Sequence, residues 1–165
     1  MREIVASCDE ICQLGILDGG DVLYVEKTEP EQAIRIEPSA GKTLVAYATA
    51  LGKCLLSGLD NDKIKSLYPR KLLHYTTHTT PDLQTLFKQL EDIRHDGYAH
   101  EVGENNKDIE CVAVPISVDN KIVASLSVSL PCFRSSTRKV KQVSNLLRKH
   151  AQLIESEIAL LPKKF

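Results

Sequence analysis

Three serines at every second position form the residue pattern that most directly suggests a site. Ser125, Ser127 and Ser129 alternate with apolar residues in the run 121–131, so on a β-strand they share one face. Two interpretations are open. The small hydroxyls either fill a crowded interior, where they bond to nearby backbone, or they line the floor of a polar pocket. Periodicity alone favours the first interpretation.

A cysteine on the preceding apolar run is a second candidate. Cys111 could act as a nucleophile, but no partner base can be placed beside it from the sequence, so a buried inert thiol is favoured. The chain has 5 cysteines at scattered positions and no C-x-x-C pair. This pattern predicts reduced thiols and gives no support to a zinc ribbon or a thioredoxin motif.

Histidines offer only weak metal motifs. His74 and His78 are four residues apart, but their segment is polar and β-branched, and Pro81 follows closely. His100 and Glu101 lack the spacing and the paired cysteines of a zinc deaminase. We therefore expect neither a metal ion nor a cofactor.

The start of a helix within residues 47–56 could bind an anion. Thr49 is the expected N-cap, which puts Ala50 and Leu51 in the first turn, where backbone N–H groups have no acceptor within the helix. Such groups and the helix dipole attract carboxylates. Every helix has such a terminus, so this one indicates a site only if the serine face lies opposite.

Strands joined by tight turns are expected to form a largely antiparallel sheet. The candidate strands are the two runs of residues 110–131 around the turn 119–121 and the two runs of 11–25 around the turn 18–21, with 33–36 as a further candidate. Residues 97–110 read as a long polar connection. Together with the helices, these strands predict an α+β fold in which helices pack on a central antiparallel sheet.

Capping residues and apolar periodicity predict several helices. Besides the helix of 47–56, Asp60 caps a short helix over 61–67. A longer helix is bracketed by Thr80 as N-cap, Pro81 at its first position and Gly97 as its stop. A last helix runs from about Ser136 to Leu161. Residues 1–10 resemble the tail of a longer helix, which suggests a piece of a larger protein.

Composition narrows the function classes. The chain has 165 residues, which suits a single domain over 1–165, and its net charge of −1 gives no basic surface for gripping nucleic acid. No run of about 20 apolar residues and no signal-peptide pattern are present. We therefore expect a cytoplasmic protein without a membrane partner.

Five stretches, in order, resemble one known family. They are 17–25, 47–56, 97–99, 111–115 and 123–129. Together they are similar to the effector-binding domain of IclR-type bacterial transcriptional regulators. The resemblance implies a GAF-like (profilin-like) fold with a small-molecule pocket and no enzyme activity. It also implies a winged helix-turn-helix domain that this chain lacks, operator DNA as that domain's partner, and homodimers or homotetramers.

The resemblance also implies a pocket for a small organic acid or sugar acid. Its effector-binding residues would be Ala50, Leu51, Glu101, Cys111, Ser127 and Ser129. The amides of Ala50 and Leu51 would receive the effector's carboxylate. The apolar wall would consist of Ile36, Leu44 and Ile109.

Departures from the family pattern concern the effector more than the fold. Glu101 stands where relatives commonly have Asp, Leu130 replaces a frequent Gly and Tyr47 a frequent His. Glu is one methylene longer than Asp, so the cavity or the reach to the ligand should differ.

The alternative function is a thiol-dependent reductase on the same fold, with Cys111 as nucleophile. It predicts a lowered thiol pKa and a resolving cysteine nearby.

Overall fold

A six-stranded antiparallel sheet organises the chain. The computed structural model describes residues 1–31 and 40–161. The strand order is β3-β2-β1-β6-β5-β4, and all pairs between neighbouring strands are antiparallel. The strands are β1 (Ile11–Asp18), β2 (Asp21–Thr28), β3 (Thr43–Val45), β4 (Ala99–Val102), β5 (Ile109–Val118) and β6 (Lys121–Pro131).

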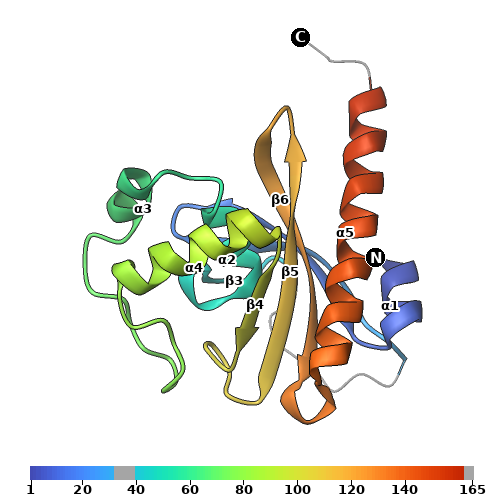
Figure 1. The fold of residues 1–165 in the computed structure, drawn as a ribbon, viewed down its shortest axis with the longest axis horizontal. Coiled ribbons are helices and arrows are strands. Elements are labelled where there is room, and N and C mark those ends of the chain that lie inside the picture. Colours follow the sequence, from blue (N-terminus) through green and yellow to red (C-terminus); the bar gives the residue numbers. More distant parts are fainter. Residues whose placement is uncertain (32–39, 162–165) are drawn as a thin grey trace.

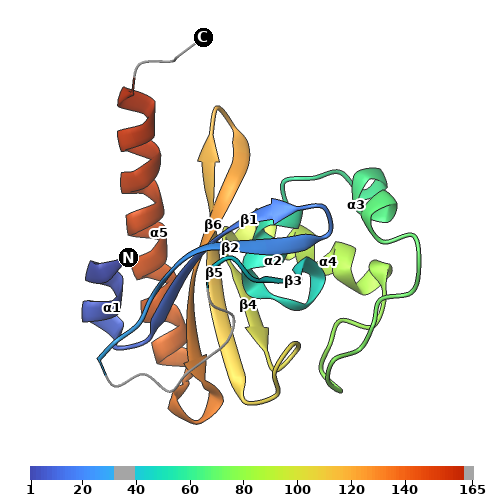
Figure 2. The ribbon, with the colours of Figure 1, turned by 180° about the vertical axis from the view of Figure 1, so that it is seen from behind.

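Helices cover both faces of this sheet (Figures 1 and 2). One face packs against α2 (Ala50–Leu56) and α4 (Leu83–Asp96), with α3 (Asn61–Leu67) further out. The other face packs against α1 (Arg2–Cys8) and α5 (Thr137–Leu160). Two short 3-10 turns, Ala46–Ala48 and Cys132–Arg134, precede α2 and α5. The predicted α+β class, with helices on both sides of an antiparallel sheet, is confirmed.

Two hairpins fix the register of the sheet. Val118 pairs with Lys121 across the β5–β6 turn, and Asp119 and Asn120 both take positive φ, as a two-residue primed turn requires. Asp18 pairs with Asp21 across the β1–β2 turn. Both predicted hairpins are confirmed. The possible strand 33–36 lies outside the described residues.

The predicted helix start at Thr80 is wrong by a few residues. Asp82 is the N-cap of α4, and its carboxylate accepts a hydrogen bond of 2.7 Å from the Thr85 amide, so Pro81 precedes the helix. Thr80 instead points its hydroxyl at a buried carboxylate. The other predicted caps are confirmed: Thr49 and Asp60 at helix starts, and Gly97 in the left-handed conformation at the end of α4. The last helix, predicted to begin at about Ser136, has Ser136 as its N-cap.

Residues 97–110 are not only a connection, as expected, because they contain the edge strand β4. Its burial alternates: Ala99 and Glu101 are buried, whereas His100 and Val102 are exposed. A buried glutamate in place of an apolar residue hid this two-residue period in the sequence. The short strand β3 was likewise not predicted.

Candidate functional site

The serine face of β6 turns toward α2. The alternate residues Leu126, Val128 and Leu130 belong to the core under α1 and α5, so the serines face the other way. Directly opposite Ser127 lie Gln13 on β1 and Ala113 on β5, and opposite Ser129 lies Cys111. Residues opposite each other in an antiparallel pair share a face, so one polar surface spans three strands.

A cavity of about 40 Å³ lies on this surface. Its wall includes five residues that the family resemblance selected: Leu44, Glu101, Ile109, Cys111 and Ser129. The wall also contains five residues that sequence reasoning did not select: Gln13, Tyr24, Thr49, Asn105 and Asn106. The fold therefore brings together side chains from all six strands of the sheet, from the N-cap of α2 and from the loop after β4.

The remaining selected residues do not form part of this wall. Ala50 and Leu51 are buried directly after Thr49, which does line the cavity. Ser127 is buried beside two wall residues, Gln13 and Ser129. Ile36 lies outside the described residues. Binding roles for these positions stay predictions.

The three serines differ in their hydrogen-bond partners. Ser125 donates to the Val114 carbonyl at 3.0 Å, so its role is structural, as the backbone-bonding interpretation expects. Ser129 donates to Oε1 of Gln13 at 2.9 Å and lies 3.1 Å from the Cys111 sulfur. Among the described residues, Ser127 carries the one fully buried side-chain oxygen or nitrogen that has no hydrogen-bond partner. Such groups in a native fold are rare and call for a physical reason.

The start of α2 is held rigidly against the sheet. Thr49 accepts a hydrogen bond of 3.0 Å from the Gly52 amide through its side chain. A Cβ at Gly52 would lie 2.2 Å from the Ala46 carbonyl oxygen, so only glycine allows this close approach. This packing explains why glycine follows Ala50 and Leu51, and it holds the first turn of α2 against the preceding 3-10 turn.

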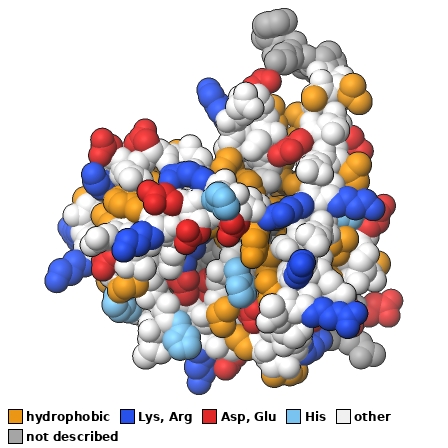
Figure 3. Space-filling model, in the orientation of Figure 1, with side chains coloured by type: hydrophobic (Ala, Val, Ile, Leu, Met, Phe, Trp, Pro, Cys, Tyr) orange, Lys and Arg blue, Asp and Glu red, His pale blue; other side chains and the backbone are white. Residues whose placement is uncertain are grey.

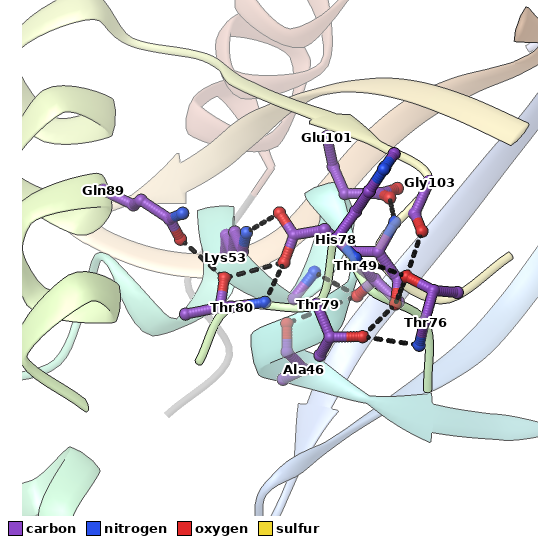
Figure 4. Close-up of polar contacts among 12 residues, drawn as sticks. Ala46, Thr49, Lys53, Thr76, His78, Thr79, Thr80, Gln89, Glu101 and Gly103 are labelled. Atoms are coloured by element: carbon purple, nitrogen blue, oxygen red, sulfur yellow. Dashed lines mark hydrogen bonds and ion pairs between the residues drawn. The ribbon is translucent and has the colours of Figure 1, made fainter. Parts of the chain in front are cut away.

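A buried charge network, which sequence reasoning missed, adjoins the cavity (Figure 4). Lys53 of α2 forms an ion pair with Glu104, in the loop after β4. The second carboxylate oxygen of Glu104 accepts hydrogen bonds from the amide (2.9 Å) and the hydroxyl (2.7 Å) of Thr80. The Thr79 hydroxyl donates to the Glu104 carbonyl at 2.6 Å. The available signal was a lysine in the middle of an otherwise apolar helix.

Glu101 is the carboxyl group nearest to this network. Its side chain accepts a hydrogen bond from the Glu104 amide. Burial raises the pKa of Glu101 to about 7, and the Glu104 charge adds to the rise, whereas the amide bond and Lys53 oppose it. Burial also lowers the pKa of Lys53, against the attraction of Glu104. Glu101 is therefore a carboxyl that gains or loses a proton near neutral pH.

Cys111 is a poor nucleophile in this setting. Burial raises the pKa of its thiol well above the ordinary value, and the Glu101 charge adds to the rise. All five cysteines are free thiols. A reactive cysteine needs a lowered pKa, so this environment counts against the thiol-dependent reductase.

A wider groove lies on the other side of β4, between α5 and the β4–β5 edge. Its volume is about 660 Å³, and it is lined by serine and threonine side chains and by His100, Glu110, Lys141 and Arg148. Figure 3 shows histidine, basic and acidic side chains along the junction between the α5 column and the rest of the molecule. None of the effector-binding or wall residues selected from the sequence lines this groove.

The described residues contain neither a metal-binding cluster nor a membrane-spanning helix. In residues 1–31 and 40–161, no cluster of at least 3 His, Cys, Asp or Glu side chains is placed to hold a metal ion. Within the same residues, no helix has the length and apolar character needed to span a membrane.

An antiparallel sheet with helices on both faces and a small polar cavity defines a GAF-like ligand-binding domain. Residues 1–156 match the family described as the C-terminal domain of the bacterial transcriptional regulator IclR. The chain belongs to the IclR family of bacterial transcriptional regulators.

Individual relatives agree with this assignment. The HTH-type transcriptional regulator KdgR of Escherichia coli K12 is 28% identical over 164 residues, which cover 96% of this chain and 61% of KdgR. The chain therefore spans only about three-fifths of this relative. The structure of Thermotoga maritima IclR matches with a TM-score of 0.88 and 30% identity, over 94% of this chain and 64% of that one.

A second similar structure contains a ligand. It is an IclR homologue from Microbacterium hydrocarbonoxydans complexed with 4-hydroxybenzoate, with a TM-score of 0.90. It is 22% identical, and the match covers 98% of this chain and 65% of the homologue. At this identity the likeness concerns the fold.

Proposed function

We propose that this domain senses a small carboxylate or sugar acid and so controls operator binding by a longer regulator. The observation that carries the proposal is the Ser127 hydroxyl, which is 1% exposed and lacks a partner beside the cavity. Leaving such a group unpaired costs about 1–3 kcal/mol. An oxygen-bearing ligand would supply the missing bond.

The surrounding groups suit an acid with an apolar portion. The amides of Ala50 and Leu51 have no acceptor within their own helix, because they stand in its first turn, and they would receive the carboxylate. Ser127 and Ser129 would bond further oxygens, and Leu44 would contact carbon atoms. 4-Hydroxybenzoate, bound by the homologue of the same fold, is itself a carboxylate.

Ligand entry requires the cavity to widen. A volume of about 40 Å³ holds roughly three water molecules. An acid with more heavy atoms therefore has to displace wall residues. Asn105 and Asn106 are the candidates, because they belong to the loop between β4 and β5 and not to the sheet. The same loop carries Glu104, so the movement would reach the Lys53 ion pair.

Regulation would follow from a shift between subunit arrangements. An effector that binds one arrangement of a dimer or tetramer more tightly favours that arrangement. An N-terminal winged helix-turn-helix in the longer protein would then meet operator half-sites at a changed spacing. Such a regulator would act in the cytoplasm, where the operator lies, without a membrane partner.

Isothermal titration with two- to six-carbon oxo acids and aldonic acids tests the site. We expect at least one acid to bind, and Ser127→Ala and Ser129→Ala to weaken it. Ser125→Ala is the matched control, because Ser125 shares the face but is bonded to backbone. If every acid that binds is unaffected by both substitutions, the site assignment fails.

A further inference from the structure

In the part of the chain that the structure describes, two buried acids beside the cavity share one buried cation. Glu101 and Glu104 are 4% and 7% exposed, and Lys53 is 2% exposed. Lys53 is paired with Glu104, and Thr80 bonds the other oxygen of the same carboxylate. Among the ion pairs of residues 1–31 and 40–161, none includes Glu101. When ionised, this carboxylate is a buried charge whose strongest support is one backbone amide.

Within residues 1–31 and 40–161, no other element packed against Glu101 supplies a positive charge. Cys111 faces it from β5 and Tyr24 from β2, and burial raises the pKa of both groups, so they are neutral at physiological pH. His78 lies near Gly103 but is exposed to solvent. Glu110 follows on β5 next to Cys111, so it points to the opposite face, where it bonds His100 at 2.6 Å.

We propose that an anionic effector binds to this domain together with one proton, which Glu101 takes up from solvent. This inference rests on the proposed function. A second anion beside an ionised Glu101 would meet repulsion that the dry surroundings strengthen. Protonation removes that repulsion and turns the carboxyl into a hydrogen-bond donor for an oxygen of the effector.

Lys53 offers an alternative way to balance the negative charge of the effector. The effector's carboxylate could draw Lys53 away from Glu104, in which case no proton is needed. That exchange would leave Glu104 buried without its cation, at a cost typical of broken buried ion pairs. Proton uptake at Glu101 costs less free energy, because the pKa of this carboxyl is already about 7.

Titration of the same acid panel between about pH 6 and about pH 8.5 tests the proposal. These acids stay ionised throughout, so any pH dependence belongs to the protein. We expect the dissociation constant to rise roughly tenfold per pH unit above the Glu101 pKa. At about pH 8, buffers of different ionisation enthalpy should report the uptake of close to one proton per bound acid.

Variants identify the group that takes up the proton. Glu101→Gln, which keeps the shape without the charge, should bind with an affinity that does not depend on pH. Glu110→Gln is the matched control, because it alters a buried glutamate on the opposite face and should keep the wild-type slope. The wild-type buffer comparison stands even if a variant fails to fold.

The outcomes separate the two proposals. If no acid binds at any pH, the proposed function falls and this inference falls with it. If acids bind with a dissociation constant that does not change with pH and without proton uptake, this inference alone is overturned. A pH slope that persists in Glu101→Gln would overturn the assignment of the proton to Glu101.

Discussion

The Cys111 sulfur lies 3.1 Å from the Ser129 hydroxyl, across the β5–β6 pair, and both atoms belong to residues that line the same small cavity. The hydroxyl is already committed to Gln13, and the thiol faces Glu101. Neither neighbour withdraws a proton from the sulfur. The cysteine therefore serves this cavity as a weakly polar wall group.

Slow alkylation of Cys111 is the first prediction. Because burial raises the pKa of the thiol, little thiolate exists at neutral pH. We expect iodoacetamide to label Cys111 at least about tenfold more slowly than free cysteine, and a bound acid to slow it further. Peptide-resolved mass spectrometry measures both rates, with the less buried Cys132 as internal reference. Rapid labelling of Cys111 would restore the reductase as a candidate.

Ser127→Ala should weaken acid binding without lowering the stability of the domain. Its hydroxyl has no partner in the free domain, so Ser127→Ala should leave the free energy of unfolding unchanged or raise it by up to about 1 kcal/mol. The same change should weaken acid binding by roughly tenfold, about 1.4 kcal/mol. Urea denaturation and calorimetric titration measure the two effects.

Ser129→Ala, unlike Ser127→Ala, should lower both stability and binding. Ser129→Ala removes a donor to Gln13 and should lower the free energy of unfolding by about 1 kcal/mol while it also weakens binding. Ser125→Ala should cost about as much stability, through the lost bond to Val114, with binding intact. A Ser127→Ala domain that is clearly destabilised would mean that the hydroxyl has a partner in solution.

Sequence patterns predicted the fold where local rules decide it. The turn of Asp119 and Asn120 and the Thr49 cap follow from short-range chemistry, and both hold in the structure. Strand β4 was missed because its inward position 101 is a glutamate, which reads as a loop residue. Its burial depends on partners far away in sequence, and no local pattern contains them.

The same limit applies to the cavity. Family resemblance selected Glu101, Cys111 and Ser129, which the fold brings together. It missed Gln13, which faces Ser127 only through the register of β1, and Lys53, whose partner Glu104 lies 51 residues away in sequence. A polar residue on an apolar element signals that a partner exists but does not say which one.

Breaking the buried ion pair should be costly. Lys53→Met leaves the Glu104 carboxylate buried without its cation and should lower the free energy of unfolding by about 3–5 kcal/mol. Adding Glu104→Gln should recover most of that loss, because the Thr80 bonds remain available to an amide oxygen. Chemical denaturation of the three proteins measures the coupling.

An exposed pair supplies the control for this experiment. Lys65 and Asp62 lie 3.0 Å apart, but their side chains are 57% and 93% exposed. Lys65→Met should therefore change the free energy of unfolding by less than about 0.5 kcal/mol. Equal losses from Lys53→Met and Lys65→Met would show that burial does not govern the cost.

Glu101 should make the free domain less stable as the pH rises. Its pKa moves from an ordinary value of 4.5 to about 7 on folding. Between these values the unfolded chain loses the proton while the folded domain keeps it, so the free energy of unfolding falls as the pH rises through this window. The stabilisation is fully present below about pH 4.5 and is lost above about pH 7, a difference of about 3 kcal/mol.

Glu101→Gln should remove this step, because an amide does not titrate. Urea denaturation at about pH 5 and about pH 8 should show a smaller loss of stability in Glu101→Gln than in the wild type. Glu3→Gln, at an exposed position of α1, should keep the wild-type loss. An unchanged loss in Glu101→Gln would mean that Glu101 is ionised at neutral pH, and the effector would then meet a full negative charge in the cavity wall.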